Sequence, residues 1–486
     1  MSMSSIIADA RKNRRTALSE FDGKQLLAAF GIPVPDGIVV SNPDDIEDAL
    51  HGMTPPFAAK VMSADILHKS DAGGVRLDLA DAPAVRQAIE TMLARPEIGA
   101  AGVDGFLVEE MAGTGAEIAV GALRDPQFGP LIMVGLGGIF VEILQDVAFR
   151  LCPVTRRDAA GMLDDLRGAA LLSGARGRIP ADRDAIVDIL VKLGGADGLL
   201  MSLGEEWAEI DINPVIAAAE GAVAVDARFI LSAPGATGKS APSQRQDPGV
   251  APREFFAPLF APKTVAVVGA SGSSATIANT FIRRMKDYSY PGQIYPIHPK
   301  AAEIETLPAY PSLAETPEPI DYAYIAIGAG RIPDLLAAAC GRVRFAQVVS
   351  SGFAEVAEGK GLEKDLVEKA RAGGCRVLGP NCLGLYSPRG GVTFPADAPR
   401  ETGSVGIISQ SGGLSTDIIK RGQWRGLRLS GLVTIGNSAD LGPVDLAEFF
   451  FDDPQTRVIG LYLEDIKDGR RFFDLLRSPK ANKPVV

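Results

Sequence analysis

The sequence predicts a multidomain α/β protein, and three observations lead to that prediction. The chain has 486 residues, which at about 100–200 residues per domain suggests three or four domains. In its second half, short apolar segments alternate with helical patterns, as they do in doubly wound parallel sheets. Its first half mixes strands and helices in a less regular order.

Composition narrows the class of protein. Hydrophobic residues are 46% and charged residues 22% of the chain, which is typical of a folded globular protein and excludes wholesale disorder. The net charge of −11 argues against a general nucleic-acid or anionic-membrane binder but allows a local basic pocket for a phosphorylated ligand. Four cysteines cannot form a disulfide framework in so long a chain. With no apolar stretch long enough to span a membrane and no secretory signal, we expect a soluble cytoplasmic protein.

A linker divides the chain into two halves. Residues 234–253 are rich in Pro, Gly, Ser and Gln and contain almost no large apolar residue. Before the linker, apolar spacing predicts a helix from Leu18 that ends at Gly31 and Pro33. Further helices are expected over 82–95, 156–165 and 182–194. Strands are expected over 56–62, 105–111, 116–123 and 131–136, and as two strands within 206–231 joined by a turn at 220–221.

The second half of the chain alternates strands and helices regularly. Strands are expected over 264–270, 293–299, 322–328, 346–352, 375–381, 404–410, 429–436 and 457–465. These eight strands are more than one small domain needs, and the Gly- and Pro-rich segment 387–403 is the expected boundary between two sheet domains. Residues 480–486 have the pattern of another buried strand that is just beginning, so we expect the last domain to be incomplete.

Two Gly/Ser-rich turns are candidate phosphate sites. The first follows the strand TVAVV at Gly269 and leads into a helix, whose N-terminus could face an anion. Its GxxG spacing is a weak signal. The next strand ends with a cation, Lys300, which suits a phosphorylated ribose such as that of coenzyme A; the alternative is a solvated lysine. The second turn, at Ser411 and Gly412, could hold a phosphate or simply cap its helix.

Polar residues at three other places are candidates for chemistry. Lys60 lies on or at the end of a predicted strand and precedes a Gly-rich loop with His68, which could accept a phosphoryl group on a ring nitrogen; a lone histidine is more often a plain surface or core residue. Cys382, beside Asn381 in the turn GPNCLG, is more often structural than nucleophilic. Asn213 and Asp226 lie on two strands joined by a turn, so their oxygens could bind Mg²⁺ together; the alternative is an acidic surface hairpin.

Taken together, these motifs resemble the ADP-forming acid–CoA ligases, which are relatives of succinyl-CoA synthetase. The resemblance runs from about Leu18 to the end of the chain. The blocks that carry it are AAKVMSADILHKSDAGGV, VEEM, RDPQFGPLIMVGLGGIFVEILQDVAFR, EIDINP with VDAR, VAVVGAS, VSSGFAE, GPNCLG, ISQSGG and IGLYLED.

The resemblance implies a domain order and an activity. It implies an ATP-grasp domain over 12–235, a linker over 236–253, a Rossmann-like CoA-binding domain over 254–395, and a flavodoxin-like ligase domain over 398–486. The implied reaction joins a small carboxylic acid to CoA with ATP and Mg²⁺, through phosphohistidine and acyl-phosphate intermediates. Acetate or a larger aryl or hydroxycinnamic acid is the expected substrate.

No nucleic-acid or membrane partner is expected, and homo-oligomer formation stays open. A non-catalytic CoA- or nucleotide-sensing module and an NAD dehydrogenase are the alternatives.

The resemblance also implies roles for individual residues. For ATP these are Lys60 at the phosphates, Glu109, Glu110 and Met111 at the adenine hinge, and Glu117 near the ribose, with Asn213 and Asp226 on Mg²⁺. For CoA they are Gly269, Ala270, Ser271, Lys300, Ser351, Gly352 and Asn381. For phosphoryl transfer they are His68 as a second phosphoryl carrier, Ser411 and Gly412 at the phosphoryl group, and Glu464 as the acid that orients the main phosphohistidine.

Two departures from the family pattern stand out. His298 replaces the asparagine that is usual in the family, which affects the contacts expected with CoA. The family's main phosphohistidine lies in a segment beyond residue 486. We therefore expect this polypeptide by itself to bind ATP and CoA without steady-state turnover.

Overall fold

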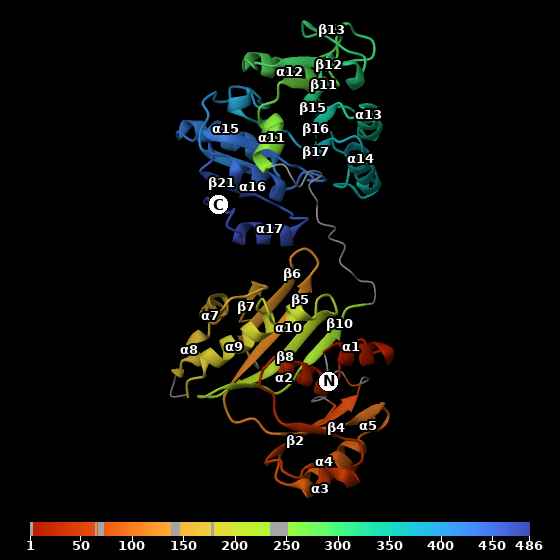
Figure 1. The fold of residues 1–486 in the computed structure, drawn as a ribbon, viewed down its shortest axis with the longest axis vertical. Helices are drawn as coiled ribbons and strands as arrows, with labels where there is room; N and C mark the ends of the chain where they lie inside the picture. The colour runs from red at the N-terminus through yellow and green to blue at the C-terminus, as the bar shows by residue number, and fades with distance from the viewer. Residues whose placement is uncertain (1–2, 64–65, 67–71, 138–145, 176–178, 234–250) are drawn as a thin grey trace. The chain divides into compact units, whose positions relative to one another are not determined.

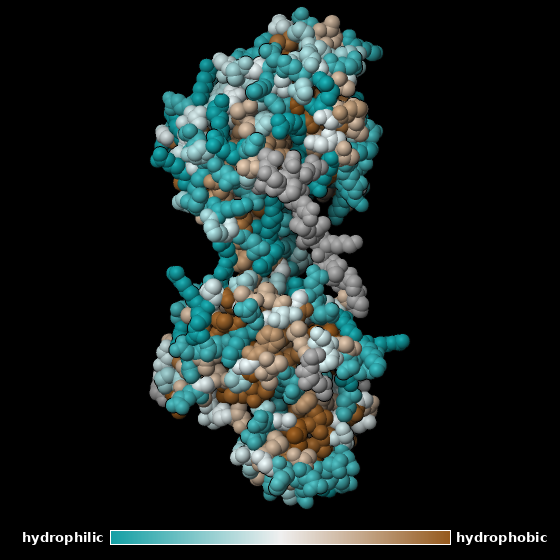
Figure 2. Space-filling view, viewed as in Figure 1, coloured by the Kyte–Doolittle hydropathy of each residue, from teal (hydrophilic) through white to brown (hydrophobic). Residues whose placement is uncertain are grey.

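The computed structural model describes residues 3–63, 66, 72–137, 146–175, 179–233 and 251–486. The chain folds as two compact units, Met1–Lys239 and Ser240–Val486, and Figure 1 labels many of their elements. In the described part of the chain, no helix is both long and apolar enough to cross a membrane. Figure 2 shows mostly hydrophilic side chains on the visible face of the C-terminal unit and larger apolar patches on that of the N-terminal unit.

The larger sheet of the N-terminal unit is antiparallel, with strand order β10-β8-β5-β6-β7 and β9 paired with β8. Its strands are β5 (Ala116–Asp125), β6 (Gly129–Leu136), β7 (Val147–Leu151), β8 (Trp207–Ala217), β9 (Ala222–Ala224) and β10 (Arg228–Leu231). The helices that share its core are α1 (Met3–Lys12), α2 (Glu20–Ala29), α7 (Arg156–Asp164), α8 (Ala169–Leu172), α9 (Arg183–Gly194) and α10 (Leu199–Ser202). The expected helices over 82–95, 156–165 and 182–194 are confirmed by α4 (Ala82–Leu93), α7 and α9.

The prediction of two strands within 206–231 is wrong in one respect. The second strand is split into β9 and β10, which pair with the two ends of the same partner, β8. The break between them, residues 225–227, lies opposite Pro214, where the Val225 N–H donates to the Pro214 carbonyl at 3.0 Å. Because proline has no N–H, the ladder cannot continue unbroken past this point.

The smaller sheet of the N-terminal unit has strand order β1-β4-β2-β3. Its strands are β1 (Gly37–Val40), β2 (Phe57–Ser63), β3 (Val75–Leu79) and β4 (Val103–Glu110). Helices α3 (Ile46–Ala49), α4 (Ala82–Leu93) and α5 (Pro96–Gly99) contribute to its own apolar core, separate from that of the larger sheet. We did not predict β1, β3 or β7, which are only four or five residues long.

The first sheet of the C-terminal unit is parallel, with order β12-β11-β15-β16-β17. Its strands are β11 (Thr264–Val268), β12 (Gln293–Ile297), β15 (Ile320–Ile325), β16 (Val343–Val348) and β17 (Arg376–Leu378). Alternate residues of β11 pack into different cores on the two faces, beside α11 (Pro252–Phe260) and α12 (Ile277–Asp287) on one face and α13 (Ile332–Ala338) and α14 (Lys360–Ala372) on the other. The predicted doubly wound arrangement is therefore confirmed, and all five strands end at one edge. A short hairpin, β13 (Glu303–Ile304) with β14 (Leu307–Pro308), follows β12.

The second sheet of this unit has strand order β18-β20-β19-β21. Its strands are β18 (Leu385–Tyr386), β19 (Val405–Ser409), β20 (Leu429–Thr434) and β21 (Val458–Tyr462), with helices α15 (Gly412–Trp424), α16 (Pro443–Asp452) and α17 (Gly469–Arg477). Pairing of β18 with β20 means that this sheet begins before the Gly- and Pro-rich segment 387–403. Near residue 486, Val485 forms a parallel bridge with Ile459 of β21, as expected for a strand in this segment.

A buried cluster of charges joins the two sheets of the C-terminal unit. The side chain of Asp440 is fully buried and accepts hydrogen bonds from Arg371, from Arg376 and from the Val377 N–H, at 2.6–2.8 Å. We call Arg371, Arg376 and Asp440 the arginine cluster. Because Arg376 lies on β17 and Asp440 follows β20, the arginine cluster links one sheet to the other.

Candidate functional sites

Four buried charged side chains meet where the two sheets of the N-terminal unit come together. Glu20 and Lys24 lie on α2, Lys60 on β2 and Glu109 on β4, and each is at most 8% exposed. The Lys24 ammonium donates to Glu20 at 2.8 Å and to both Glu109 oxygens at 2.6 and 2.7 Å. The Lys60 ammonium donates to Glu20 at 2.7 Å and lies 3.1 Å from Glu109. We call these four residues the lysine cluster.

The lysine cluster is formally neutral, and its charges depend on one another. Burial alone lowers the pKa of Lys60, but the carboxylates of Glu20, Glu109 and Asp226 outweigh burial and raise the pKa above its ordinary value. The neighbouring carboxylates therefore favour the charged form of Lys60. Removing one partner from a buried ion pair costs about 3–5 kcal/mol when the remaining charge has no other partner, but each charge of the lysine cluster has two partners of opposite sign.

The lysine cluster is tied directly to the segment that carries Asp226. The Val225 carbonyl accepts from Lys24 at 2.8 Å and from Lys60 at 2.6 Å. On the opposite strand, Asn213 lies at a register shift of β8 against β5, between the pairs Ile118↔Val215 and Val120↔Ile212. Such bulges redirect side chains next to functional sites. The structure thus brings together Lys60, Asp226 and the Asn213 segment, which lie far apart in the sequence.

The residues around Asp226 fit a magnesium ion. Glu209, Asp211 and Asn213 alternate along β8 and share its open face, away from the buried Ile210 and Ile212. Burial, and then the carboxylates of Asp226 and Glu209, raise the pKa of Asp211, so this face holds negative charge that a cation would relieve. Among the described residues, no group of three or more His, Cys, Asp or Glu side chains could hold a metal. Mg²⁺ is commonly held by one or two protein oxygens, and nucleotide phosphates complete its coordination.

The side chains of the expected adenine hinge, Glu109 to Met111, point to different places, and their role stays a prediction. We expected Glu109 at the hinge with Glu110 and Met111, but its carboxylate is buried against the two lysines. The side chain of Glu110 instead accepts from the Thr54 N–H at 2.7 Å, and the Met111 N–H donates to the Pro56 carbonyl at 2.9 Å. The side chains of Glu109 and Glu110 have different partners because neighbouring side chains on a strand such as β4 point to opposite faces of the sheet. Glu117 is exposed at the start of β5.

His68 lies outside the described residues, so its expected role as a phosphoryl carrier stays a prediction. Lys60, which precedes it in the chain, is described.

In the C-terminal unit, the residues assigned to CoA lie at the edge where the parallel strands end. Gly269 follows β11 with a φ of +102°, and a Cβ there would lie 2.2 Å from the Ala326 carbonyl oxygen, so this position requires glycine. The Ser271 N–H donates to the Asn279 side chain at 2.9 Å, and the Asn279 amide donates back to the Ser271 carbonyl at 2.9 Å. Asn279, on α12, therefore holds the loop that contains Ala270 and Ser271.

The turn after β12 explains how histidine can stand at position 298. The Nδ1 atom of His298 accepts the N–H groups of Lys300 at 3.1 Å and Ala301 at 2.9 Å. An asparagine side chain closes a turn in the same way with its carbonyl oxygen. Lys300 is exposed after this turn, at the same edge of the sheet as Gly269.

The segments after β16 and β17 are also brought together at this edge. The Asn381 N–H donates to the Ser350 carbonyl at 3.1 Å, which places the turn with Asn381 beside Ser351 and Gly352. The Cys382 thiol is buried, and burial raises its pKa to about 12. A thiol that stays protonated at neutral pH is a poor nucleophile, so Cys382 is structural, as the sequence indicated.

A second polar site lies at the ends of β19 and β21, which pair in parallel. Ser411 caps α15, with its side chain accepting from the Leu414 N–H, and Gly412 is the first residue of that helix. The side-chain oxygen of Gln410 accepts from the N–H groups of Glu464 and Asp465. The predicted residues Ser411, Gly412 and Glu464 are thus neighbours, with Gln410 joining them.

Sequence patterns did not reveal Glu20, Lys24 or Gln410. Glu20 and Lys24 stand at helical spacing with the buried Leu27 on one face of α2, so charged residues on an apolar face were the signal that could have found them. Gln410 follows a buried strand in a serine-rich turn and carried no such signal.

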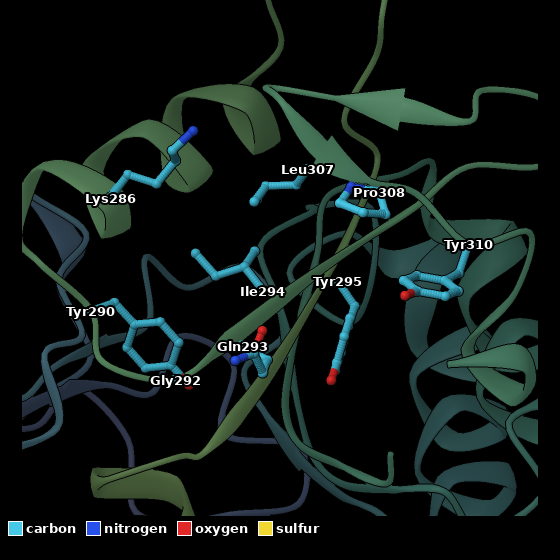
Figure 3. Close-up of a pocket in the computed structure, with 9 residues that line it drawn as sticks. All are labelled: Lys286, Tyr290, Gly292, Gln293, Ile294, Tyr295, Leu307, Pro308 and Tyr310. Atoms are coloured by element: carbon cyan, nitrogen blue, oxygen red, sulfur yellow. The ribbon is translucent and has the colours of Figure 1, made fainter. Parts of the chain in front are cut away.

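A pocket of about 250 Å³ lies beside the edge strand β12, away from these sites (Figure 3). Tyr290, Tyr295 and Tyr310 are among its lining residues, together with Lys286, whose ammonium already donates to the Glu305 carbonyl and to Thr306. Gly292 and Gln293 place it at the beginning of β12, whereas Lys300 follows the other end of that strand. None of the predicted site residues lines this pocket.

The chain is similar to known proteins along most of its length. Three family models match: an ATP-grasp domain over residues 9–231, a CoA-binding domain over 263–388 and a succinyl-CoA ligase-like flavodoxin domain over 402–486. The ADP-forming acetate–CoA ligase II of Archaeoglobus fulgidus is 34% identical over 476 residues, which is 96% of this chain and 67% of that protein. The beta subunit of the ADP-forming acetate–CoA ligase I of Pyrococcus furiosus is 41% identical over 227 residues, 46% of this chain and 96% of the subunit.

Among solved structures, one similar chain is the dinucleotide-forming acetyl-coenzyme A synthetase 1 of Ca. Korarchaeum cryptofilum in complex with coenzyme A, Ca-AMPCP and HgCl+. It is 38% identical and covers 48% of this chain and 100% of its own, with a TM-score of 0.44. Since the Archaeoglobus relative extends the match across nearly all of this sequence, the chain belongs to the family of ADP-forming acetate–CoA ligases.

Proposed function

We propose that the protein is an ATP-dependent acid–CoA ligase, which converts a carboxylic acid, ATP and CoA to acyl-CoA, ADP and phosphate. The observation that carries the proposal is the contact of Lys60 with the Val225 carbonyl at 2.6 Å. That contact sets a buried cation beside the Asp226 segment, as binding of a metal-complexed triphosphate requires. A separate edge of parallel strands, in the other unit, offers the positions for CoA.

In the nucleotide site, each residue has a distinct task. Lys60 binds the ATP phosphates, Glu110 and Met111 contact the adenine, and Glu117 lies near the ribose. Asn213 and Asp226 hold Mg²⁺, which when bound neutralises charge on the phosphate oxygens. The raised pKa of Lys60 keeps its ammonium charged across the physiological range.

His68 is the proposed acceptor of the phosphoryl group. A neutral imidazole nitrogen attacks the γ-phosphorus of ATP, and the bond from that phosphorus to the bridging oxygen breaks as ADP leaves. His68 then passes the phosphoryl group to the main phosphohistidine, a different residue, and transfer from there to the carboxylate gives an acyl phosphate without release of phosphate to water. Ser411 and Gly412 bind the phosphoryl group at the start of α15, where the helix N-terminus favours an anion, and Glu464 orients the main phosphohistidine.

In the CoA site, Gly269, Ala270, Ser271 and Lys300 face the CoA phosphates. Ser351, Gly352 and Asn381 line the path to the acyl phosphate, where the CoA sulfur attacks the carbonyl carbon and phosphate leaves. The named relatives act on acetate and, in Nitrosopumilus maritimus, on 4-hydroxybutyrate, so we propose a small aliphatic acid as the substrate. Aryl and hydroxycinnamic acids remain a prediction to be tested.

The proposal is tested by ligand binding to the purified chain and by its labelling with a phosphoryl group. Calorimetry should detect binding of Mg-ATP and of CoA, and incubation with γ-labelled ATP should place an acid-labile phosphoryl group on the protein. His68→Ala should abolish that labelling while leaving CoA binding unchanged. A panel of carboxylic acids, followed by CoA consumption with the complete enzyme that also supplies the main phosphohistidine, then identifies the substrate. Failure to bind either ATP or CoA would contradict the proposal, whereas binding of both without labelling would favour the sensing module.

A further inference from the structure

Lys24 is a saturated, buried cation to which no part of the reaction has yet been assigned. Its ammonium has four acceptor atoms within 2.6–2.8 Å: one oxygen of Glu20, both oxygens of Glu109 and the Val225 carbonyl. An ammonium has three protons to donate, so all of them are in use. Lys24 is 3% exposed, and it therefore cannot reach a ligand without leaving these partners.

The partners of Lys24 come from both parts of the N-terminal unit. Lys24 and Glu20 lie on α2, whose apolar residues belong to the core of the larger sheet, whereas Lys60 and Glu109 lie on strands of the smaller sheet. The ion pairs cross between these parts, because Lys24 binds Glu109 and Lys60 binds Glu20. If Lys60 turns toward a phosphate, Lys24 is the cation that still contacts both carboxylates.

The Val225 carbonyl gives Lys24 a second task. Lys24 and Lys60 share this acceptor, and the Val225 N–H donates to the Pro214 carbonyl at 3.0 Å. The peptide before Asp226 is thus held from one side by lysine and from the other by the residue that follows Asn213. When Lys60 leaves, the bond from Lys24 keeps the Val225 peptide in place.

We propose that Lys24 is a positioning residue of the nucleotide site, which anchors the Val225 peptide and the two buried carboxylates so that Lys60 can bind phosphate and Asp226 can face the metal. The inference rests on the proposed function in two respects, namely that Lys60 binds ATP and that Asn213 and Asp226 bind Mg²⁺. It adds that the contribution of Mg²⁺ to nucleotide affinity depends on a lysine that touches neither nucleotide nor metal.

The test measures the affinity of the full-length chain for β,γ-methylene ATP by calorimetry, once with Mg²⁺ and once with EDTA. We call the dissociation constant in EDTA divided by that in Mg²⁺ the metal benefit. Lys24→Met should reduce this benefit about tenfold or more, the size of effect seen when a residue supporting a metal ligand is lost. A merely structural loss would lower the folded fraction and leave the ratio unchanged.

Lys192→Met is the matched control. Lys192 also donates to a backbone carbonyl, that of Gly31 just after α2, at 2.6 Å, but it is not part of the lysine cluster. This variant should keep the full metal benefit. If Lys24→Met does not fold, Lys24→Gln decides instead, because its amide can still donate to one acceptor; we expect a smaller but measurable loss of the metal benefit.

The outcomes separate the two proposals. A wild-type chain that binds no Mg-nucleotide overturns the proposed function and this inference together. A wild-type chain that binds Mg-nucleotide, with folded Lys24 variants that keep the full metal benefit, overturns this inference alone. Loss of the benefit in the Lys24 variants but not in Lys192→Met supports it.

Discussion

The two units each bury a cluster of charges, but the clusters differ in the kind of cation they use. In the N-terminal unit, two ammonium groups share two carboxylates and a backbone carbonyl. In the C-terminal unit, two guanidinium groups surround a single carboxylate, that of Asp440, whose oxygens also accept a backbone N–H. The lysine cluster lies at a candidate ligand site, whereas the arginine cluster joins two sheets.

This difference follows from the chemistry of the two side chains. A guanidinium group is a rigid planar fork that fits one fixed arrangement of oxygens, and an ammonium group is a point charge on a flexible stem. The arginine cluster therefore suits a joint with one geometry. The lysine cluster can exchange one acceptor for another, as a site must when an anionic ligand enters.

Breaking the arginine cluster should give the largest change in stability. Asp440→Asn removes the nearer carboxylate from Arg376, which is 2% exposed and keeps only a longer contact of 3.8 Å with Asp445, and should lower the free energy of unfolding by about 3–5 kcal/mol. Chemical denaturation of the full chain measures this change. Asp417→Asn, which removes a surface pair with Arg421 on α15, is the control and should change stability by less than about 1 kcal/mol. Equal effects of the two substitutions would contradict a structural role for the arginine cluster.

Removing Lys60 should show that the lysine cluster serves binding. Lys60→Met eliminates charge-assisted hydrogen bonds to phosphate, each of about 1.5–3 kcal/mol, so affinity for Mg-ATP should fall roughly 10- to 150-fold. Affinity for CoA should stay unchanged, because its proposed site is in the other unit. Calorimetric titrations with both ligands check this, and an equal loss for CoA would indicate general unfolding instead.

A direct comparison of the clusters is possible with a milder substitution. Glu109→Gln removes one carboxylate but leaves both lysines within reach of Glu20 and the Val225 carbonyl. Because these ammonium groups can move to their remaining acceptors, we expect a loss of about 1–3 kcal/mol, smaller than that of Asp440→Asn. Denaturation under identical conditions tests the ranking. A loss as large as that of Asp440→Asn would mean that the lysine cluster is as rigid as the arginine cluster.

The smallest expected effect is a gain in stability, whereas the other substitutions lower stability or affinity. Burial and neighbouring carboxylates raise the pKa of Asp211, so its contribution to stability is fullest below its unfolded pKa and is lost as pH rises through its folded pKa. Without Mg²⁺, Asp211→Asn should therefore stabilise the protein at neutral pH, by less than about 1 kcal/mol. Its advantage should disappear in acid. Denaturation curves from acidic to neutral pH measure this, and destabilisation at neutral pH would show that Asp211 is not repelled by its neighbours.

Local pattern was sufficient where strands are buried on both faces. All eight strands expected in the second half of the chain are present, because short runs of apolar residues bounded by Gly and Pro are a signal contained within each segment. The break between β9 and β10 was missed, because it depends on the partner strand at Pro214. The sequence predicted His298 within a strand over 293–299, whereas β12 ends at Ile297 and the His298 ring accepts the N–H groups of Lys300 and Ala301 in the turn that follows.

The sequence by itself determined the α/β class, the linker and the motifs that mark the family, since each is carried by neighbouring residues. Tertiary structure alone decided the partners of the buried charges: Lys24 meets Glu109 across 85 residues, and Lys60 meets Val225 across 165. The physical reason is that an ion pair depends on distance in space, and a segment's own sequence does not record which distant charge the fold will bring within 3 Å of it.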